Sequence, residues 1–210
     1  MEVRWLGHAC FLCEGNGVRL LTDPFSKEVG YPLPREMVDI VTVSHDHYDH
    51  NAVQVLPGRP RVIREPGVHE AEGLRIEGFS VYHDEARGAK RGRNIIYAWE
   101  MDGIRLCHLG DLGHLLEPAT VEAIGRVDLL MVPVGGVYTI DARGAFRVVE
   151  QLNPPLVVPM HYKTPSLSFD LAPVEDFTRC FGRVRREKAL RVEKEGLPEE
   201  REVVLLDYPA

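Results

Sequence analysis

The stretch Asp39-Ile-Val-Thr-Val43 runs directly into Ser44-His45-Asp46-His47-Tyr48-Asp49-His50. Its first part is a nearly continuous run of apolar and β-branched residues, which is typical of a strand buried on both faces. Its second part carries three imidazoles and two carboxylates within the six positions from His45 to His50. Because zinc and neighbouring metals prefer these groups as ligands, the stretch predicts a metal site at one edge of a sheet.

The spacing inside this stretch indicates two ion positions. His45 and His47 are two residues apart, so in an extended chain they point the same way and can hold one ion. Asp49 and His50 follow after a turn and are placed to face a second ion. The alternative is a polar loop that is rich in histidine by chance. It is disfavoured because the chain has nine histidines, and three of them lie in this one window.

The bulk composition narrows the class of protein. Residues 1–210 are predicted to form a single domain, since the length suffices for one sizeable core and no linker or repeat is visible. The formal net charge of −7 does not favour nucleic acid as a partner. We see neither a secretory signal nor a membrane-spanning run, so we expect a cytoplasmic protein without membrane insertion. Four cysteines do not suggest a disulfide framework.

Short apolar runs recur along the chain, and Gly15-Asn16-Gly17 and Asp102-Gly103 provide hairpin turns. The predicted strands are residues 2–6, 9–13, 18–22, 39–43, 61–64, 74–82, 94–100, 104–109, 128–134, 156–160 and 202–207. The predicted helices are residues 118–124, 142–152 with Asp141 as the cap, and 173–181. Strands fill the first half and alternate with helices in the second, an order that two packed sheets with outer helices accommodate.

The pattern His45-x-His47-x-Asp49-His50 after a buried strand resembles the metallo-β-lactamase superfamily. Other pieces that resemble it follow in order along the chain, namely Thr22-Asp23-Pro24, Gly110-Asp111 and His161. Three segments are similar to one branch of that superfamily, the ascorbate-6-phosphate lactonase-like and N-acylphosphatidylethanolamine phospholipase D-like hydrolases. These segments are Gly7-His8-Ala9, Gly110-Asp111-Leu112-Gly113 and Val158-Pro159-Met160-His161-Tyr162.

This resemblance implies a mixed α/β (α+β) fold, a four-layer αββα sandwich with the site at the sheet edge between its halves. It also implies a ligand set for two divalent ions, zinc first, with manganese or iron as alternatives. The first ion would be held by His45, His47 and His83, the second by Asp49, His50 and His161, and Asp111 would bridge both. His69 is the alternative to His83, but it lies in an expected loop at residues 66–73, whereas His83 ends a predicted strand.

The chemistry that follows is metal-dependent hydrolysis of a small molecule. Metal ions lower the pKa of a bound water from ~15.7 toward ~7, which makes hydroxide available to attack a carbonyl carbon or phosphorus. Asp49 is the catalytic candidate, orienting the hydroxide and later passing a proton to the leaving group. The expected substrate is a phosphodiester or a lactone, with or without a phosphate group. The alternatives are a metal-binding or metabolite-sensing module without turnover, and a nuclease, which the acidic charge disfavours.

Four further residues are candidates around the site. Asp23, at a strand end, is expected to orient a ligand imidazole. His8 lies either beside the metals or beneath the site as a structural histidine. His114 either lines the mouth of the pocket or lies in a surface loop. Lys163 follows His161 by two positions and would add positive charge to the site.

The segment from Arg87 to Arg93 is strongly basic. It is either a solvated loop or a surface that attracts an anionic substrate to the metals. His108, inside the strand predicted at residues 104–109, is expected to be buried and satisfied by hydrogen bonds.

Overall fold

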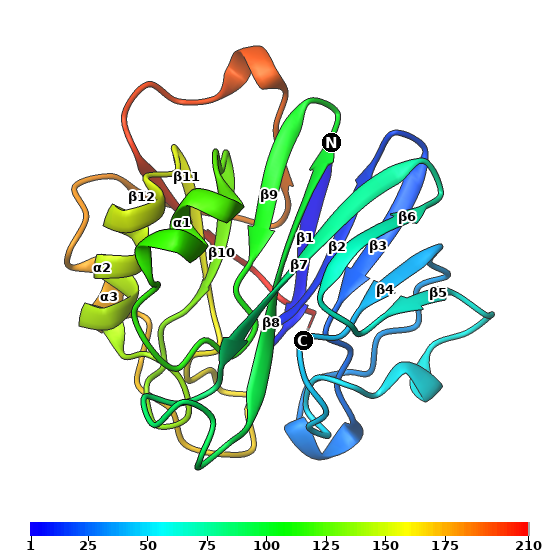
Figure 1. Cartoon of the computed structure of the whole chain (residues 1–210), viewed down its shortest axis with the longest axis horizontal. Helices are drawn as coiled ribbons and strands as arrows, with labels where there is room; N and C mark the ends of the chain where they lie inside the picture. Colours follow the sequence, from blue (N-terminus) through cyan, green and yellow to red (C-terminus); the bar gives the residue numbers. More distant parts are fainter. Residues whose placement is uncertain (210) are drawn as a thin grey trace.

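The computed structural model describes residues 1–209, which form two mixed sheets packed face to face (Figure 1). The smaller sheet has the order β13-β1-β2-β3-β4-β5. Its strands span, in that order, Leu190–Arg191, Glu2–Gly7, Cys10–Gly15, Val18–Thr22, Ile40–Thr42 and Arg61–Ile63. β1, β2 and β3 pair antiparallel, and β3, β4 and β5 pair parallel, so β1, β3 and β4 all run the same way.

The larger sheet has the order β12-β14-β11-β10-β9-β8-β7-β6. Its strands span, in that order, Val184–Glu187, Glu202–Leu206, Leu156–Met160, Leu129–Pro133, Ile104–His108, Arg93–Met101, Leu74–Tyr82 and Gly67–Ala71. The half from β12 to β9 is parallel and the half from β9 to β6 is antiparallel. As a result β7, β9 and β11 end at the same edge of the sheet.

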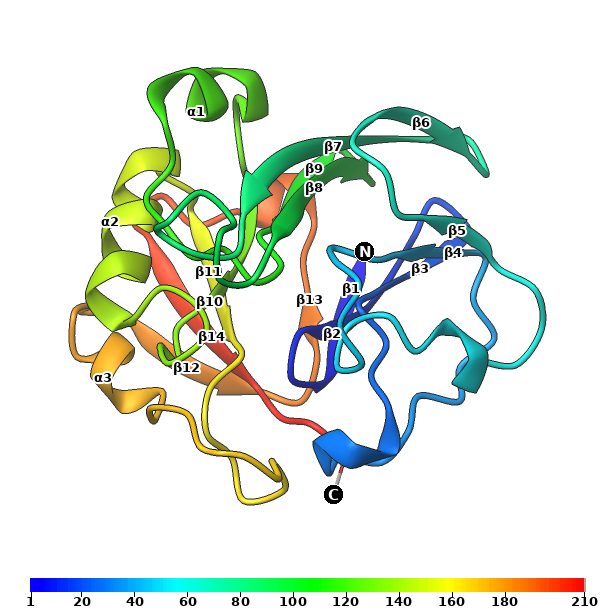
Figure 2. The ribbon, with the colours of Figure 1, turned by 60° about the horizontal axis from the view of Figure 1, so that its bottom comes forward.

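Three helices form the outer layer on the larger sheet (Figures 1 and 2). They are α1 (Pro118–Ile124), α2 (Ala142–Leu152) and α3 (Glu175–Thr178). α1 and α2 have the predicted bounds, and the Asp141 side chain caps α2 by accepting from the Gly144 amide. α3 is shorter than the predicted helix at residues 173–181. Within residues 1–209, no helix combines the length and the hydropathy that a membrane span requires.

The outer face of the smaller sheet is covered by loops and two short 3₁₀ turns, Lys27–Val29 and Val53–Val55. A separate apolar cluster fills this layer, in which Phe25, Tyr31 and Leu167 pack against sheet residues such as Leu21 and Val41. The main core lies between the sheets and contains side chains from both, including Trp5, Phe11 and Trp99. This shared core supports the prediction of a single domain, which itself stays a prediction.

Three strands were not predicted. β6 lies where a loop was expected at residues 66–73, and β12 and β13 lie between residues 181 and 202, where no element was predicted. β6, β12 and β13 are edge strands, and the burial along β6 and β12 is shallow, so neither shows the apolar pattern by which strands are recognised. β12 does carry the charges of an exposed edge, with Arg185 paired to Glu187 and Glu202.

The Tyr97 hydroxyl connects the two sheets close to the strand ends that carry the metal motif. It lies on β8, is fully buried, and is 3.3 Å from the carbonyl oxygens of both Val43 and Ile63. One hydroxyl hydrogen is thus shared between two carbonyls that follow or end strands of the other sheet.

We expect Tyr97→Phe to lower the free energy of unfolding by about 1–2 kcal/mol, because it leaves buried carbonyls without their donor. Urea titration followed by circular dichroism measures the change. Tyr82→Phe on the neighbouring strand is the matched control, since the Tyr82 hydroxyl forms no hydrogen bond within residues 1–209. Equal losses in the two variants would show that the Tyr97 hydroxyl does not link the sheets.

Candidate metal centre

The candidate residues lie at the carboxyl ends of strands that run the same way, and both sheets deliver them to one edge of the sandwich (Figure 2). From the smaller sheet, His8 follows β1, Asp23 follows β3, and the segment His45 to His50 follows β4. From the larger sheet, His83 follows β7, Asp111 follows β9, and His161 follows β11. The strand directions therefore bring together residues that are more than 150 positions apart.

The Asp111 carboxylate lies at the middle of this cluster and is almost completely buried. Its Oδ2 is 3.2 Å from His83 Nε2, 3.3 Å from His161 Nε2 and 3.9 Å from His45 Nε2. Its Oδ1 is 3.3 Å from His50 Nε2. One carboxylate thus faces four imidazole nitrogens that come from both sheets.

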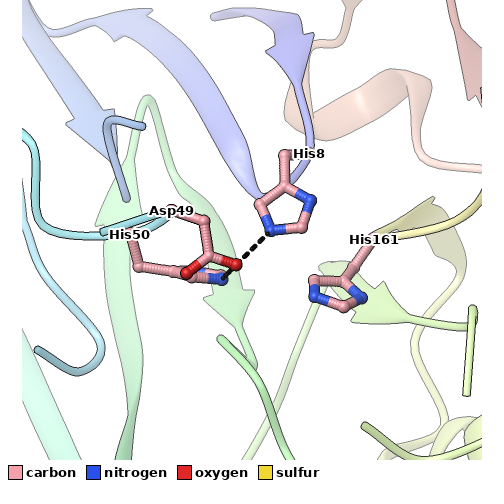
Figure 3. Close-up of side chains that lie close together, drawn as sticks. All are labelled: His8, Asp49, His50 and His161. Carbon is pink, nitrogen blue, oxygen red and sulfur yellow. Dashed lines mark hydrogen bonds and ion pairs between the residues drawn. The ribbon is translucent and has the colours of Figure 1, made fainter. Parts of the chain in front are cut away.

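Two groups of possible ligands lie around Asp111, and a third group, of His45, His50 and Asp111, joins them. The donor atoms of His45, His47 and His83 all lie within 4.8 Å of one another, and so do those of His8, Asp49, His50 and His161. Figure 3 shows the second set, whose side chains converge from separate segments. These are the residues that the superfamily resemblance implies for two ions, with His8 as an addition. Which residue binds which ion stays a prediction.

The chemistry of these atoms fits divalent metal ions. Within residues 1–209, the buried atoms His45 Nε2, His50 Nε2, His161 Nε2 and Asp111 Oδ1 have no hydrogen-bond partner. Buried polar atoms without partners are costly, and lone pairs that converge on one another are more so. Cations between them would satisfy all four atoms at once.

Asp23 fixes the tautomers of two of these histidines. Its carboxylate accepts hydrogen bonds from the Ser44 amide at 2.7 Å, the Ser44 hydroxyl at 2.6 Å and His50 Nδ1 at 2.9 Å. Because the Ser44 hydroxyl hydrogen is used on Asp23, Ser44 Oγ accepts from His45 Nδ1, 2.9 Å away. Both imidazoles therefore carry a proton on Nδ1 and direct Nε2 to the cluster, the orientation expected of metal-ligating histidines.

Burial and mutual charge set the protonation of the cluster. Burial and the neighbouring His50 lower the pKa of His45 to about 3, which keeps its imidazole neutral. Burial would raise the pKa of Asp111, but His161 and His50 outweigh it and hold the pKa well below the usual range. For His50, burial would lower the pKa, but the carboxylates of Asp111 and Asp49 raise it well above the usual range. The carboxylates of Asp111 and Asp49 thus favour a positive charge beside His50.

Three residues at the site have a left-handed backbone, which non-glycine residues rarely adopt. The φ angles are 54° at His8, 36° at Asp23 and 53° at His161. Each such residue costs of order 1 kcal/mol and persists where the surrounding structure holds it. Here the His161 amide donates to the His8 carbonyl at 3.1 Å, so the two strained turns support each other across the sheets.

Sequence reasoning missed the residue that holds the turn before Asp111. The buried side chain of Asn94 on β8 donates to the Leu109 carbonyl at 2.8 Å and accepts from the Asp111 amide at 3.0 Å. Gly110 has a φ of 54°, and a Cβ there would collide with Asn94 and Ser44, so only glycine fits. No sequence signal distinguishes Asn94 from other strand residues, because its partners are 15 or more positions away.

His108 is buried and satisfied, as predicted. Its Nε2 donates to the Ala9 carbonyl at 2.9 Å and its Nδ1 accepts from the Gly110 amide at 3.2 Å. His69 is not part of the cluster; it lies on β6, where Nε2 contacts the Glu65 carbonyl at 2.8 Å, so the loop expected at residues 66–73 was wrong.

Two pocket candidates have structural roles instead. His114 is half-buried between backbone groups: Nε2 accepts from the Tyr82 amide at 3.1 Å and Nδ1 donates to the Leu115 carbonyl at 2.7 Å. Lys163 does not offer a free charge to the site, because its ammonium contacts the carbonyls of Leu167 and Phe169 and the carboxylate of Asp170. Local carbonyl partners of this kind are not visible in a sequence.

Asp84, which follows His83, organises the basic segment. Its carboxylate accepts hydrogen bonds at 2.7–3.0 Å from four backbone amides, those of Ala86, Gly88, Lys90 and Arg91. Gly113 packs against the His83–Asp84 peptide so closely that no Cβ fits there. The loop from Glu85 to Gly92 is therefore folded around one side chain next to the metal cluster, and is not a loose solvated loop.

A hollow of about 490 Å³ opens above the cluster. Its floor includes His47, Asp49, His83 and Asp111. Its walls are the side chains Tyr48, Arg91, Tyr138 and Phe169. The cluster is thus accessible to a small molecule from solvent.

Comparison with known proteins agrees with this geometry. A family model described as the beta-lactamase superfamily domain matches residues 2–161. A UPF0173 metal-dependent hydrolase of Archaeoglobus fulgidus is 30% identical, in an alignment that covers 92% of this chain and 94% of the relative. The UPF0173 metal-dependent hydrolase Ta0764 of Thermoplasma acidophilum is 30% identical over 197 residues, covering 81% and 85%. This chain belongs to the UPF0173 metal-dependent hydrolase family of the metallo-β-lactamase superfamily.

A solved structure supports the same assignment. The crystal structure of a metallo-β-lactamase superfamily protein from Thermotoga maritima has a TM-score of 0.86 and 42% identity, with 99% of both chains covered. The metallo-β-lactamase fold expected from the motif is thereby confirmed. The closer resemblance to the lactonase-like and phospholipase D-like branch is not distinguished by these relatives and stays a prediction.

We expect Asp23→Asn to weaken metal binding by about 10- to 100-fold, because an amide cannot accept all three hydrogen bonds that orient His50 and Ser44. Competition with a chromogenic chelator measures the affinity. Asp39→Asn is the control: Asp39 also accepts a backbone amide, that of Arg19, but lies exposed at the opposite end of the sheet. Unchanged metal affinity in Asp23→Asn would contradict the role assigned to this carboxylate.

Proposed function

We propose that this chain hydrolyses a small-molecule ester bond, of a phosphodiester or a lactone, with two divalent ions held by the cluster around Asp111. The observation that supports the proposal is that Asp111 lies close to imidazoles of two groups of possible ligands, in the floor of an open hollow. When bound, such ions acidify a water molecule and stabilise negative charge on the substrate oxygen. His45, His47 and His83 would hold one ion and Asp49, His50 and His161 the other.

The ions are proposed to be zinc, with manganese or iron as alternatives. Neutral imidazoles and carboxylates admit all three metals. The Thermotoga maritima relative carries the provisional description of a Zn-dependent hydrolase, which favours zinc. A cytoplasmic location and the lactonase-like branch belong to the same proposal.

Asp49 is the proposed proton carrier, and His8 is proposed to position it. His8 Nε2 lies 3.1 Å from Asp49 Oδ2 (Figure 3), and the His8 ring is buried against the ring of His161. With its proton on Nε2, His8 donates to Oδ2 and so holds the Asp49 carboxylate in the floor of the hollow. Asp49 then takes a proton from the attacking water and returns it to the leaving oxygen.

The first test is metal removal with a substrate panel. We expect purified protein to contain about two equivalents of metal by elemental analysis, and dialysis against a chelator to abolish hydrolysis of the panel, which comprises a phosphodiester, a lactone and a thioester. Adding back zinc, manganese or iron separately should restore activity and identify the metal. Metal-loaded protein that binds these compounds but turns none of them over would instead indicate a sensing module.

The second test is Asp49→Asn at saturating metal. We expect kcat to fall by about 10²–10⁴-fold, because the amide cannot accept the proton. Metal content is measured on the same sample, so that loss of a proton carrier is separated from loss of an ion. Asp176→Asn, on the exposed face of α3, serves as the control. A variant that keeps both ions and full turnover would remove Asp49 from the mechanism.

A further inference from the structure

A second hollow lies beside the one above the metal cluster. It has a volume of about 500 Å³, and His45, Asp46 and His47 are part of its lining. Asp46, His47 and Arg91 line both hollows, so the two adjoin along this segment. A molecule larger than the scissile bond itself can therefore extend from one hollow into the other.

Three arginines line the second hollow: Arg64 after β5, Arg91 in the loop held by Asp84, and Arg93 at the start of β8. Within residues 1–209 none of the three forms a salt bridge, whereas other arginines, such as Arg19, Arg105 and Arg185, pair with carboxylates. The acidic residues in the lining are Asp46, which accepts from Asn51, and Glu65. In a chain with a net charge of −7, three guanidinium groups without carboxylate partners around one hollow are an anion-binding arrangement.

Arg91 is held in place for this role. Its amide donates to Asp84 at 2.7 Å, and its guanidinium donates to the Val137 carbonyl at 3.3 Å and lies 5.4 Å from the ring centre of Tyr138. Backbone and side chain are thus both anchored, so little conformational freedom is lost when an anion binds.

The first hollow has a different character on the side away from the metals. Its walls include Tyr48 and Tyr138, which are 54% and 41% exposed, and Phe169, whose ring lies 6.1 Å from that of Tyr138. Exposed aromatic side chains that gather at a cavity mouth are suited to a planar or apolar group.

We propose that the substrate is an amphiphilic anion: its apolar part packs against Tyr48, Tyr138 and Phe169, and its carboxylate, sulfate or phosphate is bound by Arg64, Arg91 and Arg93. This rests on the proposed hydrolysis and names the class of molecule that the site accepts. It also revises the basic-loop hypothesis. Arg87 and Lys90 are exposed and do not line either hollow, while Arg64, from another part of the chain, does.

Binding of two matched probes to the metal-loaded protein tests the proposal without turnover. Naphthalene-2-sulfonate carries both an apolar ring and an anion, and 2-(methylsulfonyl)naphthalene has the same ring and a neutral group. By calorimetry we expect the sulfonate to bind about tenfold more tightly. Arg91→Gln and Arg64→Gln should each weaken binding of the sulfonate by about tenfold and leave the affinity for the sulfone unchanged.

Arg87→Gln and Lys90→Gln are the matched controls from the same basic segment, and neither should alter binding of either probe. Tyr48→Ser should weaken both probes alike, because it removes the apolar wall. Metal content is measured on every sample, so that a failure to bind metal is distinguished from the loss of the anion subsite. Equal affinity for the two probes, or an equal loss in Arg87→Gln and Arg91→Gln, overturns the anion subsite.

Discussion

The buried carboxylate of Asp111 requires positive charge close to it, and this requirement governs the site and much of the fold around it. Asp111 faces four imidazole nitrogens, and two of those imidazoles are held by Asp23 and Ser44 with their Nε2 atoms directed inward. Such an arrangement is unfavourable in a protein interior unless positive charge joins it. The folded chain therefore favours the binding of cations at this site. The strained turns at His8, Asp23 and His161 are maintained by the packing of the two sheets.

The relative position of the sheets decides whether the two donor sets can share Asp111. Hydrogen bonds across the sandwich set that position, from Tyr97 to the carbonyl of Val43, from His108 to that of Ala9, and from the His161 amide to that of His8. These contacts lie next to the residues that face the metals. Each donor set contains residues of both sheets, so a shift of one sheet against the other would break these hydrogen bonds and pull the members of each set apart.

The segment from His45 to His50 could be predicted as a metal site because its signal is local: three imidazoles and two carboxylates directly follow an apolar run. Asp111 and His161 came from the superfamily resemblance, and both follow strands that end at the same edge of the sheet. The supporting residues could not be predicted in this way. Asn94 contacts a turn that is 15 or more positions away along the chain. Arg64 and Arg91 are distant in the sequence, and only the fold brings them to the same hollow. Lys163 does not offer the free charge expected of it, because its ammonium contacts carbonyls and a carboxylate of its own loop.

The same strand ends also build the walls of the hollows, which couples specificity to the metal cluster. Asp84, directly after His83, holds the loop that carries Arg91, and Lys163, two residues after His161, holds the loop that carries Phe169. Each wall is thus anchored by a side chain within two residues of a histidine that faces Asp111. Loop residues beyond these anchors can vary without moving the cluster, whereas changes at the anchors would disturb wall and cluster together. Divergence in substrate within this fold is accordingly expected in the loop tips.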